Sequence, residues 1–219
     1  MSPVVYACDI GSVKSGTFAW ARNDSLDSAP AASVDIDDLI AAVTRDVKKG
    51  LPIAIGFEAP LFLPVPDDSS QLNSGRTGET SRSMFAPAGA AVTTLGVHES
   101  AWIFKRLRAA LPADISLTFD WTTSDYKPKE IFIWEAFVSS TAHSDTHERD
   151  AATAVQYFLA NIANLDSVNA VTCSNPLSLI SAAALWSGWI TDIGALHIPC
   201  LVLRPTEPYT GSIEPVYIE

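Results

Sequence analysis

The feature that most constrains this chain is a nearly continuous apolar segment at residues 51–57, LPIAIGF, which ends abruptly at Glu58. A strand with apolar residues on both of its faces is typical of a sheet that helices cover on both sides. The preceding residues 35–49 predict a helix, with acids in the first turn, apolar residues at helical spacing and Gly50 directly after its end. A helix followed closely by a doubly buried strand indicates an α/β fold.

The other apolar segments predict a mixed sheet. Strands are expected at residues 4–10, 15–21, 31–36, 51–57, 130–137 and 199–204, and helices at 35–49, 99–111, 145–162 and 177–189. The first two strands flank the turn GSVKSG, as in a hairpin, whereas the later strands are linked through helices. This order predicts one domain over residues 1–219, with helices on both faces of the sheet.

Acidic residues outnumber basic ones by 25 to 14, which gives a formal net charge of −11. A protein that follows a nucleic-acid backbone over a long distance needs a basic face, so the histone-like and polybasic classes are excluded. Twelve of the 14 basic residues lie in residues 1–138, among them Lys105, Arg106 and Arg108. We therefore expect a nucleotide or a short structured nucleic acid as a partner. The sequence leaves the oligomeric state open, a homodimer included.

Neither the cysteines nor the apolar segments indicate secretion or a membrane. Cys8, Cys173 and Cys200 are odd in number and lack CxxC spacing, which argues against a disulfide framework or a thiolate zinc site. The start, MSPVVYACDIGS, lacks the basic flank and long apolar run of a signal peptide. The most apolar tract, residues 177–190, is shorter than the roughly 20 residues that a membrane span needs. We expect a cytoplasmic protein without membrane contact.

Four carboxylates occupy positions that an α/β sheet would bring together. Asp9 lies near the end of the first strand, Glu58 follows the central strand, Glu135 lies in the 130–137 strand, and Asp150 is in the second turn of a helix. Sites in open α/β sheets form beyond the carboxyl ends of neighbouring strands. Converging carboxylates repel one another, and Mg²⁺ or Mn²⁺, which prefer oxygen ligands, relieve that repulsion. The sequence therefore predicts a metal site at these four residues, and two ions there would suit phosphoryl transfer.

The motifs around these carboxylates resemble the ribonuclease H-like superfamily. The resemblance rests on DIGS at Asp9, the acid after the buried strand, and HERDA at His147. Within the superfamily the chain is most similar to a family of uncharacterised proteins, a domain of unknown function, through ACDIGSVKSGTFAWA, IAIGFEAPLFLPVP, RSMFAP, IFIWEAFV, HERDAATAV and LSLISAAALWSG. The resemblance implies a five-stranded mixed sheet in the order 3-2-1-4-5, with helices on both faces.

The resemblance also implies roles for the site residues. Asp9 takes the position of the first-strand aspartate that bridges two metal ions, and Glu58 that of the fourth-strand acid of Holliday-junction resolvases. His147 and Asp150 take the paired positions on the late helix, where their spacing places both on one face. Glu135 belongs to the motif of the uncharacterised family. These roles imply a metal-dependent nuclease or phosphodiesterase, in which Glu58 and Asp150 each hold an ion and His147 ligates an ion or moves a proton.

Two further sets of residues are candidates for the site. Lys14 or Arg82 would steady a phosphate, unless each is only a solvated surface charge. His143 and His147 stand four residues apart, so they would share a helix face with Asp150 in a zinc site, unless this segment is only the solvated start of a helix.

Other functions remain open. The turn DIGSVKSG also resembles the first phosphate loop of actin-like ATPases and sugar kinases, whose backbone amides hold phosphates. That architecture duplicates the fold, and no second such loop occurs in this sequence. A non-catalytic module that binds a nucleotide or a protein is the stronger alternative, with the long polar segment 64–83 as its contact surface.

Overall fold

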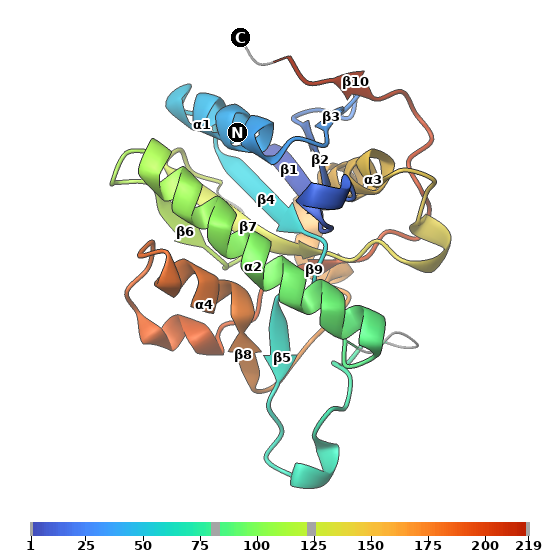
Figure 1. Cartoon of the computed structure of the whole chain (residues 1–219), viewed down its shortest axis with the longest axis vertical. Coiled ribbons are helices and arrows are strands. Elements are labelled where there is room, and N and C mark those ends of the chain that lie inside the picture. The colour runs from blue at the N-terminus through green and yellow to red at the C-terminus, as the bar shows by residue number, and fades with distance from the viewer. Residues whose placement is uncertain (1, 80–83, 122–125, 218–219) are drawn as a thin grey trace.

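The computed structural model describes residues 2–79, 84–121 and 126–217, and its centre is a mixed eight-stranded sheet. The strands are ordered β10-β3-β2-β1-β4-β7-β6, and β9 pairs with β7 off this path (Figure 1). Their bounds are β1 Val4–Asp9, β2 Ala19–Asn23, β3 Ala31–Ser33, β4 Ile53–Phe57, β6 Ser116–Thr118, β7 Glu130–Ala136, β9 Val202–Leu203 and β10 Glu214–Pro215. Strand β1 pairs antiparallel with β2 and parallel with β4, which in turn pairs parallel with β7. The predicted α/β class with a mixed sheet is confirmed.

The strands β3, β2, β1, β4 and β7 follow the expected order 3-2-1-4-5. The expected number of five strands is wrong, because β6, β9 and β10 extend the sheet. Strand β9 lies within the segment 199–204 that was expected to be a strand, whereas β6 and β10 contain only three and two residues, too few to show an alternating pattern in the sequence. A separate antiparallel pair, β5 (Phe62–Pro64) and β8 (Pro176–Ser178), is also additional to the expectation.

Helices cover both faces of the sheet, as expected. The α-helices in the described part of the chain are α1 Ile36–Lys48, α2 Pro87–Ala110, α3 His147–Asn161 and α4 Leu179–Trp186. Tyr6 and Cys8 of β1 belong to a core with α1, α2 and α4, whereas Val5 and Ala7 belong to a core with α3. Figure 1 shows α1, α2 and α4 on the near side of the sheet. None of the helices described is long and apolar enough to cross a membrane.

The central strand β4 is buried over its whole length, as its sequence predicts. A Cβ atom at Gly56 would lie 2.5 Å from the ring of Trp134 on β7, so glycine lets this large ring pack across the strand. Helix α1 before it begins where expected, because the Asp35 side chain accepts hydrogen bonds from the amides of Asp37 and Asp38. Local sequence signals are therefore sufficient to predict the central strand and the helix before it.

Two segments differ from the expectation. Residues 13–15 form a 3-10 turn, so the second strand begins only at Ala19. Helix α2 begins at Pro87, whereas the sequence predicted it only from residue 99. Its first turns, PAGAAVTTLGV, were not predicted because they consist mainly of small and largely exposed residues that form no apolar stripe.

The long polar segment 64–83 is a loop over residues 65–79, after Pro64 ends β5. It projects away from the sheet, with a 3-10 turn at Ser69–Gln71 near its tip (Figure 1). The loop returns to the body at Thr77, which forms a β-bridge with Thr172. Residues 80–83, and Arg82 with them, lie outside the described residues.

Candidate functional site

Two of the predicted carboxylates meet at the carboxyl ends of two adjacent parallel strands. Asp9 is the last residue of β1, and Glu58 directly follows β4. The backbone amide of Glu58 donates a hydrogen bond to the carbonyl oxygen of Cys8, at 2.8 Å, which continues the β1–β4 pairing by one residue. The register of the sheet therefore places both acids at the same edge, as the sequence predicts.

Helix α3 brings a third predicted residue to Asp9. Thr146 caps the helix by accepting a hydrogen bond from the amide of Arg149, which fixes His147 at the first position of the helix. The Nδ1 atom of His147 lies 2.6 Å from Oδ2 of Asp9. Only 8% of Asp9 is exposed, whereas 43% of the His147 side chain is exposed. The buried carboxylate therefore orients an imidazole whose remaining surface faces solvent.

Asp150, also on α3, forms a second carboxylate–histidine pair with His143, which precedes the helix. Its Oδ2 atom pairs with Nδ1 of His143, and its Oδ1 atom accepts hydrogen bonds from the amide and the hydroxyl of Ser144, at 2.7 and 2.6 Å. Asp150 itself is 1% exposed. His143 and His147 thus pair with different aspartates, which does not favour the zinc set of two histidines with Asp150.

Glu58 is electrostatically linked to both aspartates. Its Oε2 atom is buried and has no hydrogen-bond partner within the described residues. Burial raises the pKa of Glu58 well above its usual range, and the charges of Asp9 and Asp150 raise it further. A buried carboxylate oxygen without a donor is costly unless a proton or a cation satisfies it.

The sequence interpretation missed Glu99, a further acid of this cluster. Glu99 lies on α2, is 7% exposed, and its Oε2 atom also lacks a partner among the residues described. Burial raises the pKa of Glu99 to about 7, opposed by a hydrogen bond from the backbone of Gly11 and aided by the charge of Asp9. Helix α2 packs closely here because a Cβ atom at Gly96 would lie 2.3 Å from that of Ala59.

Burial and the surrounding charges together determine the ionisation of Asp9. Burial raises the pKa of Asp9 to about 6, the hydrogen bond and charge of His147 lower it, the charge of Asp150 raises it, and that of His143 lowers it. Asp9 is therefore largely ionised at neutral pH, but close to the range in which it takes up a proton. An ionised Asp9 accepts a hydrogen bond from Nδ1 of His147.

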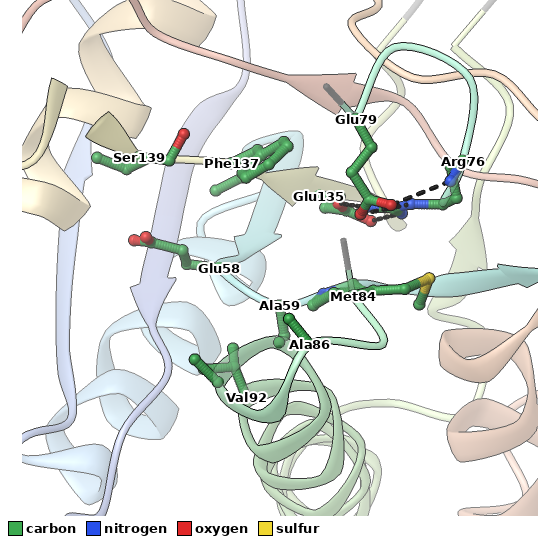
Figure 2. A pocket seen from close by; sticks show the side chains of 15 residues that line it. Glu58, Ala59, Arg76, Glu79, Met84, Ala86, Val92, Glu135, Phe137 and Ser139 are labelled. Atoms are coloured by element: carbon green, nitrogen blue, oxygen red, sulfur yellow. Dashed lines mark hydrogen bonds and ion pairs between the residues drawn. The ribbon is translucent and has the colours of Figure 1, made fainter. Parts of the chain in front are cut away.

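Glu135 does not join this cluster. It lies near the end of β7, where Arg76 donates to both of its oxygens at 2.7 Å (Figure 2). The amide of Leu61 also donates to Oε2 at 2.8 Å. Arg76 also pairs with Glu79, and all three side chains of this ion cluster are nearly fully buried. The structure thus gives Glu135 a partner that satisfies its charge, which does not favour Glu135 as a metal ligand.

Of the two basic candidates, the structure describes only Lys14. Lys14 is exposed in the 3-10 turn Val13–Ser15. The groove between α1 and α2 is basic, with Arg45, Lys48, Lys49 and Arg106 among its lining residues. Lys48 ends the helix that leads into β4, so this groove lies at the amino end of that strand, whereas Glu58 follows its carboxyl end.

The donor chemistry of the cluster fits a hard cation, although a complete ligand set is not formed. The described residues contain no group of three or more His, Cys, Asp or Glu side chains placed to hold one metal ion. However, the unpartnered oxygens of Glu58 and Glu99 are buried carboxylate oxygens, the ligands that Mg²⁺ and Mn²⁺ prefer.

Comparisons of the chain with protein-family models, with curated proteins and with solved structures found no match. The chemistry of these residues is therefore the basis of a functional proposal.

Proposed function

We propose that this protein is a divalent-cation-dependent hydrolase of phosphodiesters, a nuclease or phosphodiesterase with a ribonuclease H-like fold. The observation that carries the proposal is the Asp9–His147 pair, at 2.6 Å, in a cluster with a buried Glu58 oxygen that has no partner in the described chain. Carboxylates gathered without a matching number of basic groups favour a cation, and an oriented imidazole favours proton transfer.

His147 is the proton acceptor of the proposed site. With Nδ1 donating to the Asp9 carboxylate, the neutral imidazole has its free electron pair on Nε2. The exposed part of the ring lets Nε2 take a proton from a water molecule that attacks a phosphorus atom. Asp9 stabilises the imidazolium that forms, because the two charges are then opposite and close together.

Asp9 and Glu58 are the residues that would hold the cation, with Glu99 and Asp150 as further ligand candidates. A bound Mg²⁺ or Mn²⁺ supplies a lowered pKa for the attacking water and positive charge for the phosphate oxygens. Positive charge is needed here, since without it the carboxylates would repel the phosphate of a substrate.

The substrate class follows from the distribution of charge. The basic groove of α1 and α2 lies at the opposite end of β4 from Glu58, so it does not extend the site. A nucleotide or a short structured nucleic acid therefore suits the site better than a long duplex.

A cleavage assay tests this proposal. The protein with Mn²⁺ or Mg²⁺ is incubated with single-stranded, flap and junction oligonucleotides and with dinucleotides, and products are resolved by electrophoresis or chromatography. We expect cleavage by the native chain, loss of at least about 100-fold in Asp9→Asn, and no loss in Asp145→Asn, whose side chain is 84% exposed. Equal rates for the native chain and Asp9→Asn would refute the proposal.

A further inference from the structure

A pocket adjoins the carboxylate cluster, and Glu58 belongs to both. The pocket has a volume of about 510 Å³ and lies between the carboxyl ends of β4 and β7, the first turns of α2 and the loop that carries Arg76 (Figure 2). This volume falls within the range of small-molecule sites, which is roughly 300–1,000 Å³. A ligand in this pocket is therefore a neighbour of any group bound at Asp9 and Glu58.

The middle of the pocket is apolar and its ends are polar. The apolar lining includes Ala59, Pro60, Met84, Val92, Phe137 and Val138. Glu58 and Ser139 lie toward one end in Figure 2, and the Arg76–Glu135–Glu79 ion cluster lies at the other. Such a pocket is complementary to a flat, largely apolar group with polar atoms on its edge.

Two buried polar atoms at the Glu58 end have no partner in the described chain. They are Oε2 of Glu58 and the hydroxyl oxygen of Ser139, a residue that is 7% exposed. The residues Ala88 and Gly89 at the start of α2 also line the pocket, and the N-cap Ala86 offers them no side-chain hydrogen bond. Because first-turn amides lack intrahelical partners, the pocket offers both donors and acceptors that a ligand would satisfy.

The charges of the lining exclude two classes of ligand. Three carboxylates, those of Glu58, Glu79 and Glu135, face one guanidinium, that of Arg76, so the pocket repels a phosphate. A purely aliphatic chain would leave the Ser139 hydroxyl and the Glu58 oxygen buried without partners. A neutral ring with hydrogen-bonding atoms on its edge meets both conditions.

We propose that this pocket binds the nucleobase of a substrate whose phosphate lies at Asp9 and Glu58. This inference rests on the proposed phosphodiesterase function for the position of the phosphate, whereas the pocket itself is independent of it. The base occupies the apolar middle, and its edge atoms bond to Ser139 and the first turn of α2, beside the Glu58 carboxylate that would hold the cation.

Nucleoside binding tests the pocket without any phosphate chemistry. Adenosine, guanosine, cytidine and uridine are titrated into the metal-free protein by calorimetry. We expect binding of at least one nucleoside, a rise in its Kd of about tenfold or more in Ala88→Phe, which fills the pocket, and a smaller rise in Ser139→Ala. The matched control is Ala90→Phe, on the same helix at an exposed position outside the lining, which should bind like the native chain.

Cleavage of paired substrates separates this inference from the proposed function. A dinucleotide is compared with its abasic analogue, which has the same phosphodiester. We expect the dinucleotide to have the higher kcat/KM by about tenfold or more, and Ala88→Phe to remove this preference. Cleavage of both at equal rates would overturn the pocket assignment and leave the hydrolase intact. Cleavage of neither substrate would overturn the proposed hydrolase function. The nucleoside titrations would then test the pocket by themselves. Either no nucleoside binding or equally tight binding by Ala88→Phe would refute the pocket assignment.

Discussion

His147 and Asp9 are 138 positions apart in the sequence, yet Nδ1 of the histidine lies 2.6 Å from Oδ2 of the aspartate. The contact joins the first turn of α3 to the end of β1 and so connects the sheet edge to the helix on its second face. It gives the imidazole a fixed orientation and one preferred tautomer, which is what a proton acceptor needs.

Replacing His147 by alanine should therefore lower kcat by about 100- to 10,000-fold, the usual contribution of a positioned acid or base. The free energy of unfolding should fall by no more than about 3 kcal/mol, the upper value for a hydrogen bond to a charged group. Steady-state kinetics and urea denaturation measure the two effects separately. His197→Ala, at an exposed position, is the control and should retain native kcat. A His147→Ala protein with native kcat would show that the imidazole transfers no proton.

The stability of the cation-free protein should decrease as pH rises from about 5 to 8. The folded-state pKa is raised to about 6 for Asp9 and to about 7 for Glu99, from 3.8 and 4.5. Both groups thus favour their protonated forms in the folded state. Their contribution to stability is fully present below the unfolded-state pKa values and is lost as pH rises through the folded-state values.

Urea denaturation at several pH values, with chelator present, checks this dependence. In Glu99→Gln the decrease should be smaller, because one of the raised carboxyls is absent. Glu214→Gln, at an exposed position on β10, is the control and should follow the native curve. If the free energy of unfolding of the native chain stayed constant or rose over this pH range, the conclusion that burial raises the pKa of these two carboxyl groups would be wrong.

Part of this site was predictable from sequence because it depends on local signals. Asp9 and Glu58 each end an apolar strand, and adjacent parallel strands place such residues at one edge. Glu99 was not predictable, since the segment VHES resembles any solvated stretch of helix, and only the packing of Gly96 on Ala59 turns that face inward. The strands β6 and β10 were not predicted, because two or three residues have no recognisable period, whereas β9 lies within the segment 199–204 that was expected to be a strand.

The role of Glu135 depends on tertiary contact in the same way. Its sequence context, EIFIWEAF, indicates a buried acid that needs a partner, but not which partner. Arg76 supplies it from a polar loop 59 positions away, where nothing in the local pattern distinguishes this arginine from a solvated one. A cation and a guanidinium satisfy a buried carboxylate equally well, so the sequence alone does not separate the two solutions.

Replacing Arg76 by methionine should destabilise the protein by about 3–5 kcal/mol, because it leaves Glu135 and Glu79 buried without their common partner. The double variant Arg76→Met/Glu135→Gln should recover part of this loss, since one of the two unpaired charges is removed. Arg106→Met is the matched control: its ion pair with Asp37 is exposed, and its loss should cost less than about 1 kcal/mol. Equal losses for the two single variants, measured by urea denaturation, would show that the Arg76 cluster contributes no more than a surface pair.

Divalent cations should raise the melting temperature of the protein at pH 7.5, and a chelator should reverse the rise. A ligand present at about 100 times its Kd stabilises the folded state by about 2.7 kcal/mol, which for a chain of this size is a shift of roughly 5–10 °C. The shift arises because the cation satisfies the buried oxygens of Glu58 and Glu99 and reduces the repulsion between these groups and Asp9.

Scanning calorimetry with and without Mn²⁺ or Mg²⁺ measures this effect in the native chain and in variants. Without cation, Glu58→Gln should melt at a temperature similar to that of the native chain, whereas Asp9→Asn should melt lower, because it loses the charged hydrogen bond to His147. Both variants should gain little when cation is added. Asp145→Asn, near the same site but exposed, should gain as much as the native chain. If Glu58→Gln gained the full shift, the cation would be bound elsewhere, and the carboxylate cluster would have to act through its histidines alone.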